Sequence, residues 1–269
     1  MAKACKHIES EVLVVDNNST DGSREYLEPK FPTVRFTWNS ENLGFAKANN
    51  QALKNASGKC ILFLNPDTIV PEDCFEKCIA YLEAHADSGA LGVRMVNEKG
   101  DYLKESKRGF PSASASFYKM IGFAKLFPRS KTFAGYYAGH LPENKTSEVD
   151  VLAGAFMMVP KKVLDEVGGF DERFFMYAED IDLSYRIQQA GYKNIYFSET
   201  TITHFKGEST NTKSKKYVEL FYKAMDQFVD KHYKGKPALA RLFIKSGIAI
   251  SRTIAMLFRK RGSSLRESR

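Results

Sequence analysis

The chain has 269 residues, of which 43% are hydrophobic and 27% charged, an ordinary composition for a globular protein with a sizeable core. We find no low-complexity segment and no internal repeat, and the opening MAKACKHIES lacks the apolar centre of a signal peptide. The net charge of +8 is uneven: residues 231–269 hold eleven Lys or Arg and one acid, whereas the remainder carries a net −2. This asymmetry indicates a polyanionic partner surface, either membrane or nucleic acid.

Short apolar runs alternate with helical patterns over the first hundred residues. Strands are predicted at 11–15, 34–38, 60–67 and 90–96, with helices after the first turn, within 39–58 and at 71–85. The run at 11–15 is continuous, as in a strand buried on both faces. This order predicts an α/β fold with a mostly parallel sheet.

The second half of the chain is less regular. Residues 97–148 show no clear periodicity. Strand character returns at 149–160, a short helix ends at Gly168, one or two strands occupy 194–205, and a polar loop follows. An amphipathic helix is predicted at 216–233.

The four cysteines do not have the spacing of a zinc site. They are Cys5, Cys60, Cys74 and Cys78. Cys74 and Cys78 are four residues apart on a predicted helix and no second pair follows, so we expect buried thiols in a reducing compartment.

Three acids lie close to a strongly apolar segment. Glu179, Asp180 and Asp182 follow the sequence FFMY and open a predicted helix that ends at Gly191. Acids in a first helical turn interact favourably with the helix dipole, which explains one or two of them. Desolvated carboxylates are costly, so the third favours a charged or reactive group opposite them.

Further acids lie where predicted strands end. Asp16 and Asp21 follow the first strand, and Asp67 follows the third. Each alone is explained by a turn or a helix cap, but together they predict a carboxylate-lined crevice that holds a divalent cation and substrate phosphates. His204 ends a later strand and could add a ligand. The absence of a Gly-x-Gly-x-x-Gly, a P-loop or a Gly-x-Ser-x-Gly motif argues against dinucleotide, P-loop and serine-hydrolase chemistry.

Several blocks together resemble the family 2 glycosyltransferases, and their rhamnosyltransferase-like branch of bacterial cell-surface polysaccharide synthesis in particular. The blocks are EVLVVDNNSTDGS, NSENLGFAKANNQAL, CILFLNPDTIV, GAFMMVP, GGFDERFFMYAEDIDLSYRIQQAG and HFKGEST. They span about residues 11–210 in the family's order. The resemblance implies a GT-A fold, which is a nucleotide-diphospho-sugar-binding α/β domain, and inverting sugar transfer with Mg²⁺ or Mn²⁺.

The resemblance also assigns roles to individual residues. Donor-binding positions are Asp16, Asn18, Asp21, Asn42, Gly44, Asn65 and Gly154, with Asp16 at the nucleoside and Gly154 in the loop beside the sugar and acceptor. Asp67 resembles the metal-binding carboxylate of the family's Asp-x-Asp, with Asn65 in place of the first Asp, and His204 the C-terminal ligand to metal or phosphate. Asp180 resembles the general base, with Glu179 beside it. Phe174, Phe175 and Tyr177 would shape the pocket or belong to the core.

We therefore expect a catalytic domain at 1–210 and a helical extension at 211–269. The expected partners are a nucleotide-diphosphate sugar donor and a lipid-linked or glycan acceptor, with no nucleic acid. Only ten residues precede Glu11, so the first strand of the family's fold is expected to be missing. A sugar nucleotidyltransferase and a non-catalytic or impaired nucleotide-sugar-binding protein are the alternatives.

The tail predicts an amphipathic helix. On one side of it fall Leu242, Phe243, Ile250, Ile254 and Leu257. On the other side fall Arg241, Lys245, Arg252 and Arg259. Charges interrupt any membrane span, so we expect this helix to lie on the inner, cytoplasmic surface of the cell membrane with its basic side toward anionic headgroups. The alternative is a helix packed on the catalytic domain.

Overall fold

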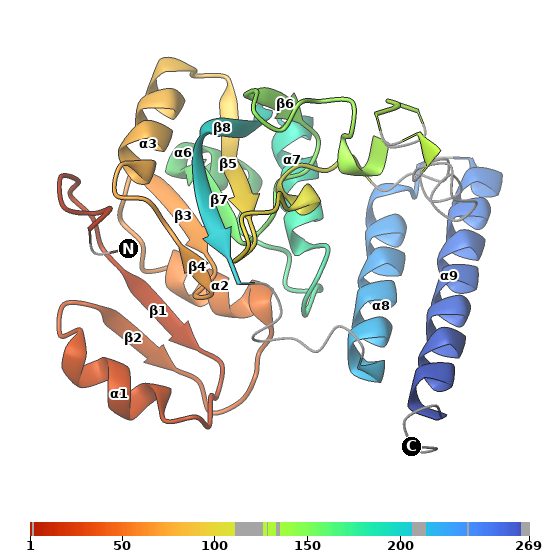
Figure 1. Cartoon of the computed structure of the whole chain (residues 1–269), viewed down its shortest axis with the longest axis horizontal. Helices are drawn as coiled ribbons and strands as arrows, with labels where there is room; N and C mark the ends of the chain where they lie inside the picture. Colours follow the sequence, from red (N-terminus) through yellow and green to blue (C-terminus); the bar gives the residue numbers. More distant parts are fainter. Residues whose placement is uncertain are drawn as a thin grey trace.

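The computed structural model describes residues 1, 3–110, 126–127, 129–132, 135–205, 214–235 and 237–264. Most of the polar block HFKGEST, and the side chain of Arg259, lie outside these residues. Figure 1 shows an α/β body with a pair of long helices at one side. In chain order the strands are β1 (Leu13–Asp16), β2 (Arg35–Trp38), β3 (Cys60–Leu64), β4 (Thr68–Ile69), β5 (Ser88–Val96), β6 (Ser147–Val149), β7 (Phe156–Pro160) and β8 (Lys193–His204).

The helices follow the predicted order. They are α1 (Ser23–Lys30), α2 (Phe45–Leu53), α3 (Cys74–Ala84), α6 (Lys161–Val167), α7 (Glu179–Gln189), α8 (Lys215–His232) and α9 (Ala238–Ser264), with short 3-10 turns at Lys104–Ser106 and Gly135–Tyr137. Gly168 ends α6 at a φ of 82°, a left-handed conformation that glycine adopts readily. The predicted strand at 149–160 is divided into β6 and β7, which contain only its ends.

The main sheet is mixed rather than mostly parallel. Its strand order is β3-β7-β5-β8-β4, with β6 also beside β8, and only β5 and β8 run parallel. The prediction of a mostly parallel sheet was therefore wrong. A continuous apolar run shows that a strand is buried but not which way it points, and β7 runs antiparallel to both of its neighbours.

The first two strands form a separate parallel sheet. Val14 pairs with Phe36 and Asp16 with Trp38. Among the described strands, β1 pairs only with β2. All four β1 residues are only half-buried, so the prediction of a strand buried on both faces was also wrong.

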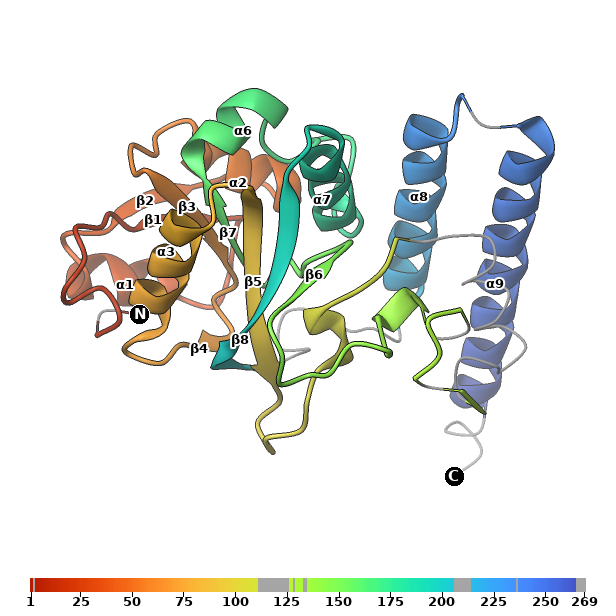
Figure 2. The same ribbon diagram turned by 90° about the horizontal axis from the view of Figure 1, so that it is seen from above.

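Helices cover both faces of the main sheet (Figure 2). On one face α3 packs through Cys74, Phe75 and Cys78. On the other face α2, α6 and α7 share a core that includes Leu183 and Ile187. Both cysteines of α3 are buried free thiols, as predicted. This three-layer arrangement fixes α7, and the acids at its start, against the sheet.

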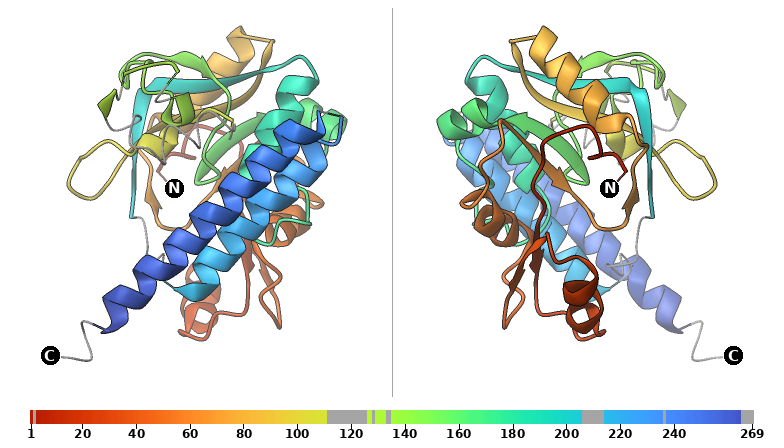
Figure 3. Two further views of the ribbon diagram at one scale, coloured as in Figure 1. Left: turned by 90° about the vertical axis from the view of Figure 1, so that its right-hand side faces the viewer. Right: turned by 90° about the vertical axis from the view of Figure 1, so that its left-hand side faces the viewer.

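The two C-terminal helices form a hairpin beside this body. Helix α8 packs on α7 through Ala224, Met225 and Phe228. Helix α9 lies outside α8 as the outermost layer (Figure 3). Within the part of the chain that is described, no helix combines the length and the apolar character that a membrane span needs.

Helix α9 contacts α8 through its polar side. Arg241 pairs with Asp230 at 2.9 Å, and Lys245 pairs with Asp230 at 2.8 Å and Asp226 at 3.3 Å. Leu242 and Phe243 remain 63% and 61% exposed on the opposite side. Of the predicted basic side, Arg241 and Lys245 face α8 because α8 carries acids opposite them, whereas Arg252 is exposed.

Candidate active site

The loop after β1 is stabilised by hydrogen bonds to the carboxylates of Asp16 and Asp21. The Asp16 carboxylate accepts the Ser19 N–H at 2.8 Å, and Asp21 accepts both the N–H and the hydroxyl of Ser23. These hydrogen bonds lower the pKa of Asp21. Asn18 between them has a φ of 68°, which few residues other than glycine and asparagine adopt. The loop is thus a structured turn at the carboxyl end of β1.

Gly44 joins the start of α2 to the segment before α7. Its N–H donates to the Asn42 side chain at 2.9 Å, and its carbonyl accepts from the Asn17 amide at 3.2 Å. The next N–H, that of Phe45, donates to the Phe175 carbonyl at 2.8 Å. A Cβ atom at position 44 would lie 2.4 Å from that carbonyl oxygen, so only glycine fits here. Gly44 therefore allows the start of α2 to lie directly against the segment before α7.

Asp67 and His204 meet where β4 pairs with β8. The register places Thr68 opposite His204, and the Phe205 N–H donates to the Asp67 carbonyl at 2.9 Å. The Asp67 Oδ1 atom lies 3.2 Å from His204 Nε2, although their orientation is not that of a hydrogen bond. Asp67 Oδ1 and His204 Nδ1 are both buried and have no hydrogen-bond partner among the described residues. Such unpartnered atoms suit a cation or ligand that completes them.

Asp180 and Asn65 are connected through the loop before β7. The Gly154 N–H donates to Asp180 Oδ2 at 3.1 Å. One residue further on, the Ala155 carbonyl accepts the Asn65 N–H at 3.0 Å. Asn65 in turn accepts from the Thr68 hydroxyl at 2.8 Å, beside the pair formed by Asp67 and His204. A few short contacts therefore connect the predicted base to the predicted metal ligands.

Asp180 also forms an ion pair that the sequence did not predict. Arg108 Nη2 lies 2.5 Å from Asp180 Oδ2, and both side chains are largely buried. Arg108 is fixed by backbone hydrogen bonds to Val151 and by the Leu152 carbonyl. An adjacent guanidinium compensates a carboxylate for lost hydration. Asp180 Oδ1 accepts only the Ile181 N–H among the described contacts, so it has capacity for a further donor.

The backbone before α7 is in an uncommon conformation. Tyr177 and Ala178 have φ values of 71° and 65°, in the left-handed region that side chains with a Cβ atom rarely adopt. Such residues cluster at functional sites because the surrounding fold must hold them. Here Tyr177 packs edge-on against Tyr217 and Phe221 of α8. Helix α8 therefore supports the segment that presents Asp180.

Glu179 points into the protein. It is 7% exposed, and its Oε2 atom is buried without a hydrogen-bond partner. Burial, together with the charge of Asp180, raises the pKa of Glu179 to about 8. A carboxyl with this raised pKa is mostly protonated at neutral pH and is therefore a poor proton acceptor there.

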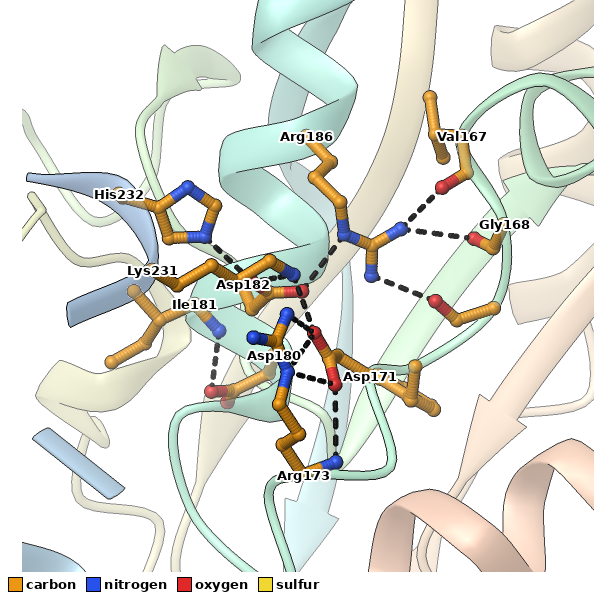
Figure 4. A network of polar contacts seen from close by, with 12 residues as sticks. Val167, Gly168, Asp171, Arg173, Asp180, Ile181, Asp182, Arg186, Lys231 and His232 are labelled. Atoms are coloured by element: carbon orange, nitrogen blue, oxygen red, sulfur yellow. Dashed lines mark hydrogen bonds and ion pairs between the residues drawn. The ribbon is translucent and has the colours of Figure 1, made fainter. Parts of the chain in front are cut away.

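Asp182 is the centre of a buried charge cluster (Figure 4). Its fully buried carboxylate lies 2.8 Å from Arg186 and 2.6 Å from both Lys231 and His232, the last two in the final turn of α8. Lys231 also pairs with Asp171 at 2.6 Å. This cluster, which the sequence did not predict, fastens α8 to α7 two residues from Asp180.

Two curated proteins are similar in sequence to this chain. The chain is 27% identical over 271 residues to the N-acetylglucosaminyl-diphospho-decaprenol L-rhamnosyltransferase of Mycobacterium tuberculosis, covering 96% of this chain and 85% of the relative. It is 31% identical over 172 residues to the rhamnosyltransferase WbbL of Escherichia coli K12, covering 60% of this chain and 61% of the relative.

Solved structures show the same fold. The mannosyltransferase PcManGT of Pyrobaculum calidifontis, in complex with GDP-Man and Mn²⁺, has a TM-score of 0.54 at 17% identity over 95% of this chain and 70% of that one. GalNAc-T7 with UDP, GalNAc and Mn²⁺ has a TM-score of 0.54 at 13% identity over 88% of this chain and 48% of that one. The fold is GT-A, as predicted. The model of Glycosyl transferase family 2 matches residues 2–168, more than half of the chain, which therefore belongs to this family of glycosyltransferases.

Proposed function

We propose that this glycosyltransferase moves a sugar, a deoxyhexose such as rhamnose, from a nucleoside-diphosphate donor to a lipid-linked or glycan acceptor with inversion at the anomeric carbon. One observation carries the proposal: Asp180 and the pair Asp67–His204 are joined through Gly154, Ala155 and Asn65. An inverting transfer needs a base on one side of the sugar and stabilisation of the leaving diphosphate on the other. The contacts support both groups serving one reaction centre.

Asp180 is the proposed general base. It would accept the proton of the acceptor hydroxyl as that oxygen attacks the anomeric carbon and the bond to the nucleoside diphosphate breaks. Asp180 Oδ1 has the capacity to accept a hydrogen bond from the acceptor hydroxyl. Arg108 and the Gly154 N–H donate to Oδ2 and fix the orientation of the carboxylate. The protonated, buried Glu179 favours Asp180 over its neighbour for this role.

Asp67 and His204 are the proposed protein ligands of a divalent cation. A carboxylate oxygen and an imidazole nitrogen suit Mn²⁺ better than Mg²⁺, which prefers oxygen. No group of three or more His, Cys, Asp or Glu side chains in the described part of the chain forms a metal cage, so the donor phosphates would supply further ligands. When bound, such an ion offsets charge that develops on the leaving diphosphate.

The donor's nucleoside would lie on the turn after β1. Asp16, Asn18 and Asp21 form this turn, and the Asn17 amide connects it to Gly44. GDP-Man is named for the mannosyltransferase complex, and UDP and GalNAc are named for the GalNAc-T7 complex. The name of the mycobacterial relative includes N-acetylglucosaminyl-diphospho-decaprenol. These names support, for this chain, the donor class and a lipid-linked acceptor.

We place the enzyme at the cytoplasmic surface of the cell membrane. The apolar outer side of α9 supports a lipid-facing surface, with Leu239, Leu242 and Phe243 each more than half exposed. The four cysteines are free thiols, which suits a reducing compartment. Leu242→Asp with Phe243→Asp should abolish flotation with phosphatidylglycerol vesicles. Because Arg241 and Lys245 are engaged with α8, salt should weaken flotation of the parent only partly.

A screen of donors tests the enzymatic proposal. UDP-, GDP- and dTDP-sugars would be incubated with Mn²⁺ or Mg²⁺ and a soluble N-acetylglucosaminyl-diphospho-lipid, and the anomeric configuration of the product read by proton NMR. We expect one donor class to be used, faster with Mn²⁺, with an inverted product. Retained configuration, or turnover that a chelator leaves unchanged, would contradict the proposed mechanism.

A further inference from the structure

A groove lies between residues 216–226 of α8 and residues 245–256 of α9. Its volume is about 870 Å³, within the range of small-molecule sites. Leu220 of α8 and Ile248 and Met256 of α9 line its walls, and all three are half-buried. The groove therefore has an apolar interior that neither helix fills.

The rim of the groove is basic. Lys216, Lys223 and Arg252 line it and are exposed, and none of the three forms an ion pair among the described residues. The two acids of the lining, Glu219 and Asp226, are each neutralised by a lysine. Three cationic side chains without an acidic partner, around a groove with an apolar interior, favour a ligand that has a phosphate group and an apolar chain.

The two helices that line the groove extend to the end of the molecule at which β1 and β8 end. Figure 1 shows the start of α8 and the end of α9 at the same end of the molecule as the carboxyl ends of β1 and β8. Tyr217, next to Lys216, stacks edge-on with Tyr177 at a centroid distance of 5.1 Å. Tyr177 lies three residues before Asp180, so α8, which forms one wall of the groove, also contacts the segment that carries the proposed base.

We propose that this groove binds the diphosphate-bearing lipid of the acceptor, with the chain between the apolar walls and the phosphates at Lys216, Lys223 and Arg252. The inference rests on the proposed function, because it assumes that the acceptor sugar is carried by such a lipid. In this proposal the groove recognises the carrier lipid, whereas the residues around Asp180 and Asp67 act on the sugars.

Binding of farnesyl diphosphate to the full chain tests the site. Calorimetry would compare farnesyl diphosphate with farnesol and with inorganic diphosphate, and a diazirine-bearing farnesyl diphosphate would be located by mass spectrometry. We expect the diphosphate to bind best and to label residues of α8 and α9. Labelling elsewhere would overturn the proposal.

Two variants test separately how the groove binds the phosphate group of the lipid and its apolar chain. Replacing Lys216, Lys223 and Arg252 with Gln should weaken binding by about tenfold or more, since each phosphate contact is charge-assisted. Ala249→Trp, within the groove, should also weaken it by obstructing the chain. A control with the same charge change replaces the exposed Lys54, Lys99 and Lys162 with Gln and should bind like the parent.

Donor hydrolysis distinguishes the possible failures. The variant with Gln at positions 216, 223 and 252 should hydrolyse donor at the parental rate, because none of the three substituted residues belongs to the proposed donor site. A parent that binds farnesyl diphosphate in the groove but uses no donor would refute the proposed function and leave the groove as a binding site for lipid diphosphates. Unchanged farnesyl diphosphate binding in the triple variant, with lost binding to phosphatidylglycerol vesicles, would make the rim a phospholipid site and overturn the proposal.

Discussion

Replacing Asp182 with Asn should destabilise the protein without changing its active-site groups. Asp182 is fully buried, and its carboxylate contacts Arg186, Lys231 and His232 at 2.6–2.8 Å. The amide has nearly the same shape but no charge. The substitution therefore removes the one anion around which three cationic or ionisable groups are gathered.

The contacts that remain limit the size of the effect. Removing one partner from a buried charge cluster typically costs about 3–5 kcal/mol. Arg186 keeps its hydrogen bonds to the carbonyls of residues 167–169, and Lys231 keeps its ion pair with Asp171. Because these partners remain, we expect a loss near the lower limit, about 3 kcal/mol.

Urea unfolding followed by circular dichroism would measure the loss at pH 7. Asp87→Asn is the matched control, since Asp87 also pairs with a lysine at 2.6 Å but on an exposed surface, and we expect little change in the free energy of unfolding. Lys231→Met, alone and combined with Asp182→Asn, would give the coupling between the two helices.

The effect should also depend on pH. Burial alone would raise the pKa of Asp182, but the hydrogen bond from His232 and the charge of Arg186 lower it on balance. A group whose pKa is lower in the folded state contributes its full stabilisation above the unfolded value of about 3.9 and loses it as pH falls through the folded value. The gap between parent and variant should therefore be constant from about pH 5 to 7 and shrink below about pH 4. A loss under about 1 kcal/mol at pH 7, or a gap unchanged in acid, would refute the assignment.

Three further substitutions test the candidate active site. Asp180→Asn should lower the transfer rate by about 10²–10⁴ while nucleotide affinity stays near the parental value; near-parental turnover would exclude Asp180 as the base. Asp67→Ala should abolish the enhancement of nucleotide binding by Mn²⁺ in calorimetry, which the exposed Asp73→Ala should preserve. Gly44→Ala should lower both stability and donor affinity more than Gly100→Ala, which has a similar φ but open space around it.

The positions of most elements could be predicted from the sequence, but not their directions. Apolar runs located β2 and β5 to within two residues, and Gly168 marked the end of α6. The same runs could not show that β7 enters antiparallel between β3 and β5, because a strand buried on both faces has the same pattern in either direction. Strand direction depends on long connections that carry no periodic signal.

The sequence likewise predicts some contacts of the candidate active site and not others. Asp67 and His204 could be predicted to approach each other because both end predicted strands, and the register of β4 and β8 brings them together. Arg108 could not be predicted, since it lies in an aperiodic segment 72 residues from Asp180. Lys231 and His232 belong to a helix whose polar side gave no indication of which acid it would meet.

The three acids at the start of α7 illustrate what helical geometry adds to a cluster in sequence. Each residue turns by about 100°, so neighbours point in different directions. The Glu179 side chain is buried in the core. The Asp180 carboxylate contacts Gly154 and Arg108, and the Asp182 carboxylate contacts Lys231 in the last turn of α8. A single helical turn therefore carries the proposed base and also the anchor of the C-terminal hairpin. The hairpin that offers the groove and the apolar side of α9 is thus held in register with Asp180 by the buried carboxylate of Asp182.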